Sequence, residues 1–117
     1  MNEQNYVSLT GRLTADPDAR QTPAGVAVTE FAIAVNRRVR NGEGRFEDRL
    51  DGYFDCQTWR DEAEISAKVL RKGTAVRVIG ILLQKRWQDG EGNPRSRIVV
   101  QADEVYVPLG IANLAET

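Results

Sequence analysis

Residues 53–87 read YFDCQTWRDEAEISAKVLRKGTAVRVIGILLQKRW, and the order of the patterns in this stretch decides the fold. Residues 53–59 alternate between apolar and polar side chains, which predicts a strand. Residues 61–72 are spaced for a helix, and residues 75–87 are rich in the β-branched side chains of a long strand. The stretch therefore predicts a strand, a short helix and a second strand in that order.

The predicted helix has a start signal and a stop signal. Asp61 and Glu64 have the spacing of a capping box, in which each side chain accepts a hydrogen bond from the other residue's backbone N–H. Gly73 can adopt the left-handed conformation that ends a helix. The apolar side chains are spaced for one face, which we expect to pack against a sheet: Ile65, Val69 and Leu70.

The rest of the chain adds three strands to these two. Residues 6–13 alternate, residues 26–35 are dominated by β-branched side chains, and residues 97–107 follow a glycine-rich turn. The polar stretch 36–51 interrupts the pattern and predicts a long hairpin loop. Five strands with one short α-helix between the third and the fourth is the element order of an OB-fold, so we predict an all-β, five-stranded OB-fold barrel.

A single domain accounts for nearly the whole chain, because 117 residues are too few for two ordinary domains. We assign residues 1–109 to the barrel and residues 110–117 to a short C-terminal extension without a strong structural signal. The longest apolar run, residues 78–83, is too short to cross a bilayer, and residues 1–5 lack the pattern of a secretory signal. We therefore expect a cytoplasmic protein with no membrane contact.

The sequence contains one cysteine and no histidine. This excludes an intramolecular disulfide and leaves no plausible set of nitrogen or sulfur ligands for zinc, so we expect no metal and no cofactor. We do not expect an enzyme either, because the commonest general base is missing and no complete phosphate-binding loop or nucleophile motif is present. Cys56 lies on the apolar side of its strand and is expected to be a small buried residue.

The two sides of the strand at 53–59 do not divide simply into core and solvent. One side carries Phe54, Cys56 and Thr58, and the other carries Tyr53, Asp55, Gln57 and Trp59. Two aromatic side chains that share a face with polar ones can stack against nucleobases, although either ring alone could also cover the edge of the core. Trp87 follows two cationic residues just before a glycine-rich turn, where a barrel would expose it. We therefore predict base stacking on Tyr53, Trp59 and Trp87.

The formal net charge of −1 argues against nucleic-acid binding unless the cations are clustered. The loop at 36–51 is locally rich in arginine, although on its own it could be an ordinary solvated loop. Alternation places Lys85 on the same face as Trp87 and Arg86 on the other face, unless a bulge intervenes. The residues that we expect to meet phosphates are Arg37, Arg38, Arg40, Lys72, Lys85, Arg86 and Arg95.

The strand at 75–87 is apolar on both faces, so both faces must be covered. One face carries Val76, Val78, Gly80 and Leu82, and the other carries Ile79, Ile81 and Leu83. Since the domain has one helix, we expect the second face to pack against another copy of the chain. The alternative is that the helix or a loop covers it.

Several stretches resemble the bacterial SSB family in their order and spacing, over residues 5–109 and essentially without gaps. They are LTGRL at 9–13, DP at 16–17, TPAG at 22–25, FAIAVNR at 31–37, LRKG at 70–73 and KRWQD at 85–89. The resemblance implies an OB fold, a homotetramer and single-stranded DNA wrapped around the assembly. It also implies stacking by Tyr53, Trp59 and Trp87, the residues already selected by strand alternation.

The sequence departs from the family pattern at three places. A position that is often tryptophan in the family is Val39 here, and a position that is often basic is Asp55. Residues 113–117 read NLAET, without the linker and acidic tail by which the family recruits partner proteins, so we do not expect recruitment through such a tail.

The resemblance implies sequence-independent binding and protection of single-stranded DNA in replication, recombination or repair, at the bacterial nucleoid. The alternative function is an OB-fold protein-interaction module of the primosome type with weak affinity for DNA.

Overall fold

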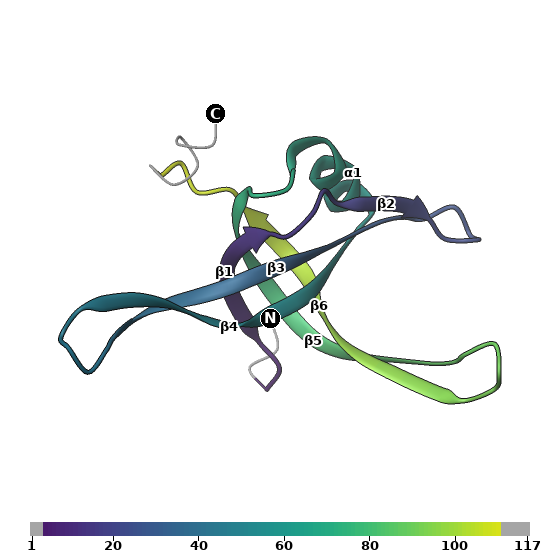
Figure 1. Cartoon of the computed structure of the whole chain (residues 1–117). Coiled ribbons are helices and arrows are strands. Elements are labelled where there is room, and N and C mark those ends of the chain that lie inside the picture. The colour runs from purple at the N-terminus through teal and green to yellow at the C-terminus, as the bar shows by residue number, and fades with distance from the viewer. Residues whose placement is uncertain (1–3, 111–117) are drawn as a thin grey trace.

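The computed structural model describes residues 4–110, which fold into a β-barrel with one helix (Figure 1). The elements are β1 Val7–Leu13, β2 Asp18–Gln21, β3 Ala27–Arg40, β4 Phe46–Trp59, α1 Arg60–Val69, β5 Ala75–Gln88 and β6 Pro94–Tyr106. The strand order is β1-β5-β6-β4-β3-β2, and β1 also pairs with β3, which closes the barrel. Of these pairs, β4 with β6 is parallel and the others are antiparallel.

The closed barrel of β1, β3, β4, β5 and β6, with α1 between its third and fourth strands, confirms the predicted OB-fold. Strand β2 was not predicted, because its four residues follow a turn cluster and carry no apolar alternation. Among the described residues it pairs with β3 alone, and it is exposed along its whole length. This segment is therefore a strand because its backbone pairs with β3. Its side chains show no strand pattern from which it could have been predicted.

The barrel interior is filled by inward side chains that alternation predicted on β1, β3, β4 and β5, together with Val100 and Ala102 of β6 and Leu70, whereas Leu82, expected on the side of Val78, is 44% exposed. The buried cluster consists of Leu13, Phe31, Ile33, Cys56, Leu70, Val76, Val78, Val100 and Ala102. Cys56 is fully buried, and this burial together with the charge of Asp55 raises the pKa of its thiol to about 12. The cysteine is thus a core residue, as expected.

The start of α1 differs from the sequence prediction. The N-cap is Trp59, no side chain caps the helix, and Asp61 lies in the first turn. The predicted capping box was therefore wrong. Arg60 adopts a left-handed conformation with φ of 58°, which turns the chain from β4 directly into the helix without a loop. This abrupt turn moves the helix start ahead of Asp61.

The buried face of α1 also differs from the prediction. Ala63 and Ser66 are buried, whereas Ile65 and Val69 are more than half exposed. Leu70 is buried, but it lies just after the helix, which ends at Val69 rather than near residue 72. Gly73 does have a positive φ, but in the turn before β5, where its N–H donates to the carbonyl oxygen of Leu13.

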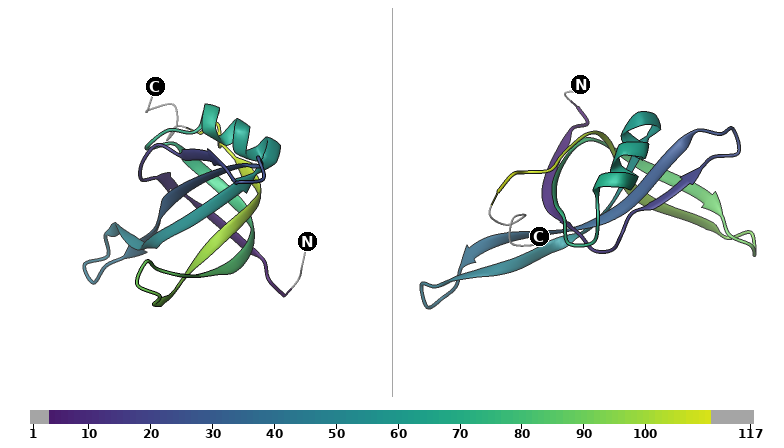
Figure 2. Two further views of the ribbon diagram at one scale, coloured as in Figure 1. Left: turned by 90° about the vertical axis from the view of Figure 1, so that its right-hand side faces the viewer. Right: turned by 90° about the horizontal axis from the view of Figure 1, so that it is seen from above.

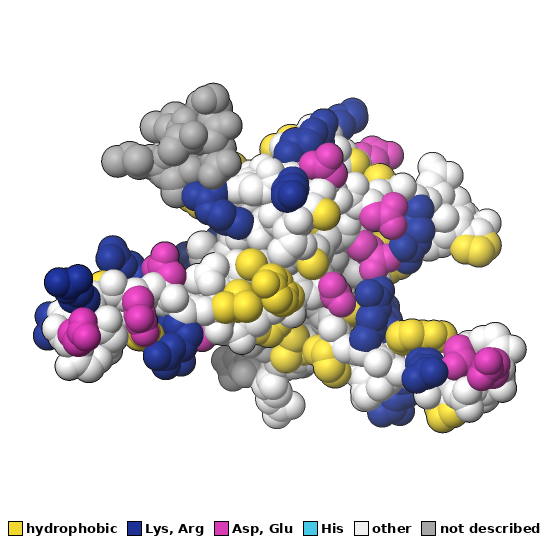
Figure 3. Space-filling view, viewed as in Figure 1, with side chains coloured by type: hydrophobic (Ala, Val, Ile, Leu, Met, Phe, Trp, Pro, Cys, Tyr) yellow, Lys and Arg dark blue, Asp and Glu magenta, His cyan; other side chains and the backbone are white. Residues whose placement is uncertain are grey.

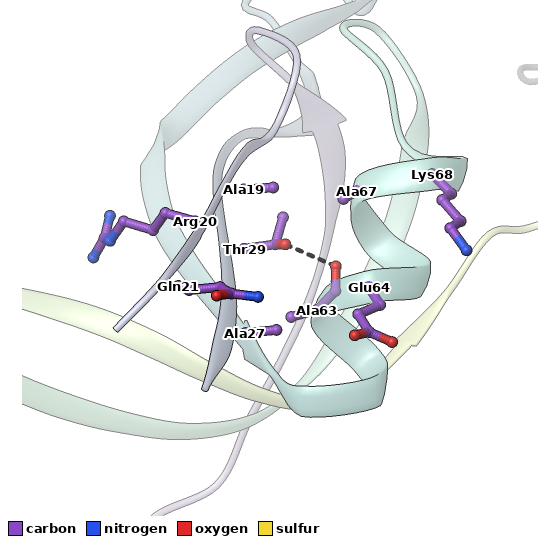
Figure 4. Close-up of a pocket in the computed structure, with 9 residues that line it drawn as sticks. All are labelled: Ala19, Arg20, Gln21, Ala27, Thr29, Ala63, Glu64, Ala67 and Lys68. Atoms are coloured by element: carbon purple, nitrogen blue, oxygen red, sulfur yellow. Dashed lines mark hydrogen bonds between the residues drawn. The ribbon is translucent and has the colours of Figure 1, made fainter. Parts of the chain in front are cut away.

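The helix sits close to the barrel because the side chains between them are small. Thr29 donates a hydrogen bond of 2.7 Å to the carbonyl oxygen of Ala63 (Figure 4). A hollow of about 500 Å³ lies between α1 and the β2–β3 hairpin, lined in part by Ala19, Ala27 and Ala67. The helix thus closes one end of the barrel.

Residues 36–51 were predicted to form a loop, but most of them belong to strands. Strands β3 and β4 pair from Val28–Trp59 out to Arg40–Phe46, and Asn41 closes the turn by accepting from the N–H groups of Glu43 and Arg45. Strands β5 and β6 extend in the same way to the Gln88–Pro94 pair. The right-hand view of Figure 2 shows these two ribbons projecting from the barrel in opposite directions.

Within residues 4–110, no helix has the length and apolar character needed to cross a membrane. The same part of the chain holds no cluster of three or more side chains suited to bind a metal ion. The predicted C-terminal extension lies outside the described residues, except for Gly110.

Candidate nucleic-acid interface

The strand register shows which side chains share the outer face of β4. Directly paired residues in antiparallel strands project to the same side of a sheet. Tyr53 is 67% exposed, and Trp59 is partly buried at the start of the helix. The two aromatic side chains are therefore on one outer face, as alternation predicted. The outward pairs of this face are Ala34–Tyr53, Ala32–Asp55, Glu30–Gln57 and Val28–Trp59.

The end of β5 contributes a second tryptophan and a lysine to the same outer face. Ile81 and Gln57 both pair with the outward Gln101 of β6, and β5 is regular from there to its end. Lys85 and Trp87 therefore project outward, as alternation predicted, and Arg86 projects to the other side. The Lys85 Nζ lies 6.0 Å from the centre of the Trp59 ring.

A shallow hollow of about 460 Å³ opens between these side chains. Trp87, at its edge, is 47% exposed. The hollow joins aromatic faces to cationic side chains, which are the two features that single-stranded nucleic acid requires of a binding groove. Its lining consists of Arg20, Gln57, Trp59, Lys85, Arg86, Trp87 and Arg97.

An ion-pair network lies along the same face, centred on Glu30. Arg97 Nη2 donates to Glu30 Oε2 over 2.7 Å, Gln57 Nε2 donates to the same oxygen over 3.2 Å, and Arg20 pairs with the other oxygen. Arg97 also lies 3.5 Å from Asp55. The charge of Asp55, which departs from the family pattern, is therefore balanced by Arg97.

The sequence analysis did not select Arg20 or Arg97. Arg97 could have been predicted from the sequence, because the turn between β5 and β6 sets the hairpin register and places Arg97 opposite Lys85. No comparable signal existed for Arg20, which lies on the unpredicted strand β2.

The network changes the acidity of Glu30. Burial raises the pKa of its carboxyl, but hydrogen bonds from Arg97 and Gln57 and the charge of Arg20 outweigh burial and hold the pKa below its ordinary value of 4.5. Glu30 is therefore ionised at neutral pH, and both arginines are partly neutralised by it.

Two buried polar atoms on this face lack a hydrogen-bond partner within the described part of the chain: Gln57 Oε1 and Trp59 Nε1. The carboxylate of Glu30 can only accept a hydrogen bond, so the Gln57 amide must present its nitrogen there and leave its oxygen unpaired. Unsatisfied buried polar groups are uncommon and cost stability. The two residues occupy adjacent outward positions of β4.

Apart from Lys85, the residues predicted to contact phosphates lie on the β3–β4 ribbon, near the β5–β6 turn, and in the turn between α1 and β5. On the β3–β4 ribbon, Arg38 and Arg40 share one face, whereas Arg37 lies on the other and pairs with Asp51 at 2.9 Å. Near the β5–β6 turn, Arg95 pairs with Asp89 at 3.1 Å. On the visible side of the molecule, Lys and Arg lie over both ribbons, interspersed with Asp and Glu, and a hydrophobic patch lies on the barrel between the ribbons (Figure 3).

Arg86 and Lys72 are less closely joined to the aromatic residues. Arg86 donates to Gln84 Oε1 over 2.8 Å on the opposite side of β5. Lys72 lies in the turn between α1 and β5, where its backbone N–H donates to Asp16 Oδ1 over 2.8 Å. The structure thus brings together Trp59, Lys85, Trp87 and its register partner Arg95, but not the whole predicted cationic set.

Ile79, Ile81 and Leu83 project from the outer face of β5, and each is partly buried. The helix packs mainly against β3 and β4, so of the two alternatives it is not the helix that partly covers this row. The apolar row continues along the strand into Lys85 and Trp87.

A closed five-stranded barrel with one helix between its third and fourth strands defines an OB-fold protein, and its outer face here carries aromatic and cationic side chains. The profile of the Single-strand binding protein family matches residues 4–108, and the chain belongs to that family. This agrees with the family resemblance noted in the sequence.

Named relatives are similar over most of the chain. The "Single-stranded DNA-binding protein" of Deinococcus radiodurans is 41% identical over 101 residues, which cover 86% of this chain and 33% of that protein. The "Single-stranded DNA-binding protein A" of Bacillus subtilis is 41% identical over 101 residues, which cover 86% of this chain and 57% of that protein. The "Single-stranded DNA-binding protein" of Mycobacterium tuberculosis is 37% identical, covering 91% of this chain and 65% of the relative.

Proposed function

We propose that the chain binds single-stranded DNA without sequence preference and does no chemistry on it. One observation carries this proposal: Trp59, with Lys85 at 6.0 Å from its ring, lies on the same outer face as the exposed Trp87. A base can stack on each indole while its phosphate meets the neighbouring cation. Membership of the Single-strand binding protein family supports the same function.

Indifference to sequence follows from the type of contact. Every nucleobase has a π-face, and stacking on an aromatic side chain is worth about 1–3 kcal/mol for any of them. A protein that binds in this way can coat unpaired DNA wherever it arises. We therefore propose that it protects single-stranded DNA in replication, recombination or repair.

A primosome-type interaction module with weak DNA affinity is the second candidate. The observation that favours it is the Glu30 network, because Arg20 and Arg97 are already paired with carboxylates and are less available to phosphates. Measured affinity separates the two candidates.

We propose further that the chain assembles through the outer row of β5, formed by Ile79, Ile81 and Leu83, and that the assembly is a homotetramer. The row is apolar, projects outward and is only partly covered within the chain. Burying such side chains against a second copy is favourable.

A mobility-shift experiment with a long oligo-dT and the matching duplex tests the proposed function. We expect tight binding to oligo-dT, no selection among mixed sequences, and much weaker binding to the duplex. Weak binding to both would favour the interaction module. Preference for the duplex would contradict the proposal.

A further inference from the structure

The pairing of β3 with β4 contains one extra residue on β4. Val35 pairs with Gly52 and Asn36 pairs with Leu50, so Asp51 has no partner of its own and forms a β-bulge. A one-residue insertion reverses which side each following side chain points to. The bulge therefore reverses alternation along the outer half of β4.

This reversal changes which side chains share a face with Phe46. By unbroken alternation, Phe46 and Leu50 would share the inward side with Cys56. In the structure, Phe46 pairs with Arg40 and Leu50 pairs with Asn36, and both β3 residues are in step with the outward partners of Tyr53 and Trp59. The outer face of the barrel thus continues along the ribbon to Phe46.

The surroundings of Phe46 combine an exposed ring with two cations. Its side chain is 58% exposed. The guanidinium carbon of Arg38 lies 5.4 Å from the ring centre and that of Arg40 lies 5.2 Å from it, and both arginines are exposed to solvent. The next outward residue along β4 is Asp48, the register partner of Arg38, and the one after it, Leu50, is 44% exposed.

We infer that Phe46, between Arg38 and Arg40, is a further stacking site for single-stranded DNA, at the tip of the β3–β4 ribbon. This inference rests on the proposed function. A base stacks on the exposed part of the ring, and the two guanidinium groups, which hold the ring in place, meet the phosphates on either side. The strand of DNA then leaves the barrel at Tyr53 and follows the ribbon outward.

The length of the ribbon makes this site a separate contact. Phe46 lies seven positions from Tyr53 and thirteen from Trp59 on β4, about 23 Å and about 43 Å along a strand at roughly 3.3 Å per residue. A short oligonucleotide on the barrel cannot reach Phe46, whereas a long one can. Loss of Phe46 should therefore affect long DNA more than short DNA.

The test uses the full chain with four variants: Phe46→Ala, Phe46→Leu, Phe46→Trp and, as the matched control, Val39→Ala. Val39 pairs with Glu47 on the opposite face of the same ribbon. Affinity is measured with a long and a short oligo-dT, and the number of nucleotides bound per chain at saturation is measured with the long one. Circular dichroism and thermal unfolding check that each variant is folded.

We expect Phe46→Ala and Phe46→Leu to bind the long oligo-dT roughly 5- to 150-fold more weakly and to cover fewer nucleotides per chain. Binding of the short oligo-dT should change little. Phe46→Trp should keep both affinity and coverage, and Val39→Ala should behave as the wild type. The leucine variant keeps apolar bulk but has no ring, so its result isolates stacking.

Wild-type affinity and coverage for Phe46→Leu would overturn the inference and leave the proposed function intact. An equal loss in Val39→Ala would overturn it as well, because the effect would then belong to the ribbon and not to the ring. Failure of the wild type to bind oligo-dT would contradict the proposed function itself, and the inference with it.

Discussion

Lys85 and Arg86 are neighbours in sequence but differ in their surroundings. Lys85 lies over the Trp59 ring, whereas Arg86 projects to the other side of β5 and bonds to Gln84. Replacing Lys85 by Ala should therefore weaken binding to oligo-dT and flatten its salt dependence. Arg86→Ala should have the smaller effect on both.

The dependence of the binding constant on salt measures this difference. For single strands, the slope of log K against log salt changes by about 0.7 for each phosphate that the protein no longer neutralises, because fewer counterions are released. We expect a change of about this size for Lys85→Ala. Identical slopes in the wild type and both variants would exclude Lys85 and Arg86 from the phosphate path.

Glu30 should make stability depend on pH in the acid range. Its folded-state pKa is lowered from 4.5, so the ionised carboxylate stabilises the folded state above that pH. This stability is lost as the pH falls below 4.5 through the lowered pKa, because the protonated carboxyl no longer pairs with Arg20 and Arg97.

Urea unfolding of the wild type and of Glu30→Gln over this pH range checks the prediction. The variant should be less stable at neutral pH, by about 1–3 kcal/mol for the missing charged hydrogen bonds, and should lose less stability on acidification. Parallel loss of stability in both proteins would show that other groups cause the acid dependence.

At the scale of elements, alternation, β-branched composition and turn residues together identified the five barrel strands. Alternation placed Cys56 inward and Trp59 outward, and it put Lys85 on the face of Trp87. These assignments depend only on the two-residue period of a strand, which sequence displays directly.

The features that sequence missed depend on contacts between segments. The bulge at Asp51 is set by the pairing with β3, and residues 36–51 show no alternation because both faces of the ribbon meet solvent. The helix start was misplaced because Arg60 takes a left-handed conformation that its residue type disfavours. The β5–β6 turn could have placed Arg97 beside Lys85, but its contact with Asp55 depends on the parallel pairing of β6 with β4.

Gly80 lies where the backbones of the paired strands β5 and β6 approach closely, and a residue with a Cβ atom does not fit there. The register of the two strands shifts between Ile79 and Gly80, and a Cβ atom at Gly80 would overlap the carbonyl oxygen of Gln101. Backbone atoms cannot move aside as a flexible side chain can, so Gly80→Ala should destabilise the barrel by at least about 1–3 kcal/mol.

Gly90→Ala is the matched control, because a Cβ atom at Gly90 meets nothing within 4 Å. Its stability should stay within about 0.5 kcal/mol of the wild type. Both variants are compared by thermal unfolding. Equal melting temperatures for Gly80→Ala and Gly90→Ala would mean that the two strands can separate at Gly80 without cost.

At the scale of the whole molecule, one strand carries two proposed functions. The apolar row of β5 lies along the outer face, directly before Lys85 and Trp87. Assembly through this row would hold the DNA faces of neighbouring copies in a fixed relation, so that one strand of DNA could pass from one copy to the next.

Sedimentation tests the assembly. We expect the wild type to give a multiple of the 13.1 kDa chain mass. Ile81→Glu should dissociate it, because an unpaired carboxylate is costly to bury in an apolar interface. A wild type that is monomeric at micromolar concentration would contradict the proposed interface.

The most direct measurement of the central claim is the tryptophan fluorescence of the wild-type chain during titration with oligo-dT at low salt. The sequence has two tryptophans, Trp59 and Trp87, and both lie on the proposed DNA face. We predict strong, saturable quenching by oligo-dT and little by duplex DNA, with Trp59→Ala and Trp87→Ala each binding about 1–3 kcal/mol more weakly. An unchanged fluorescence signal at saturating oligo-dT would contradict the claim that bases stack on this face.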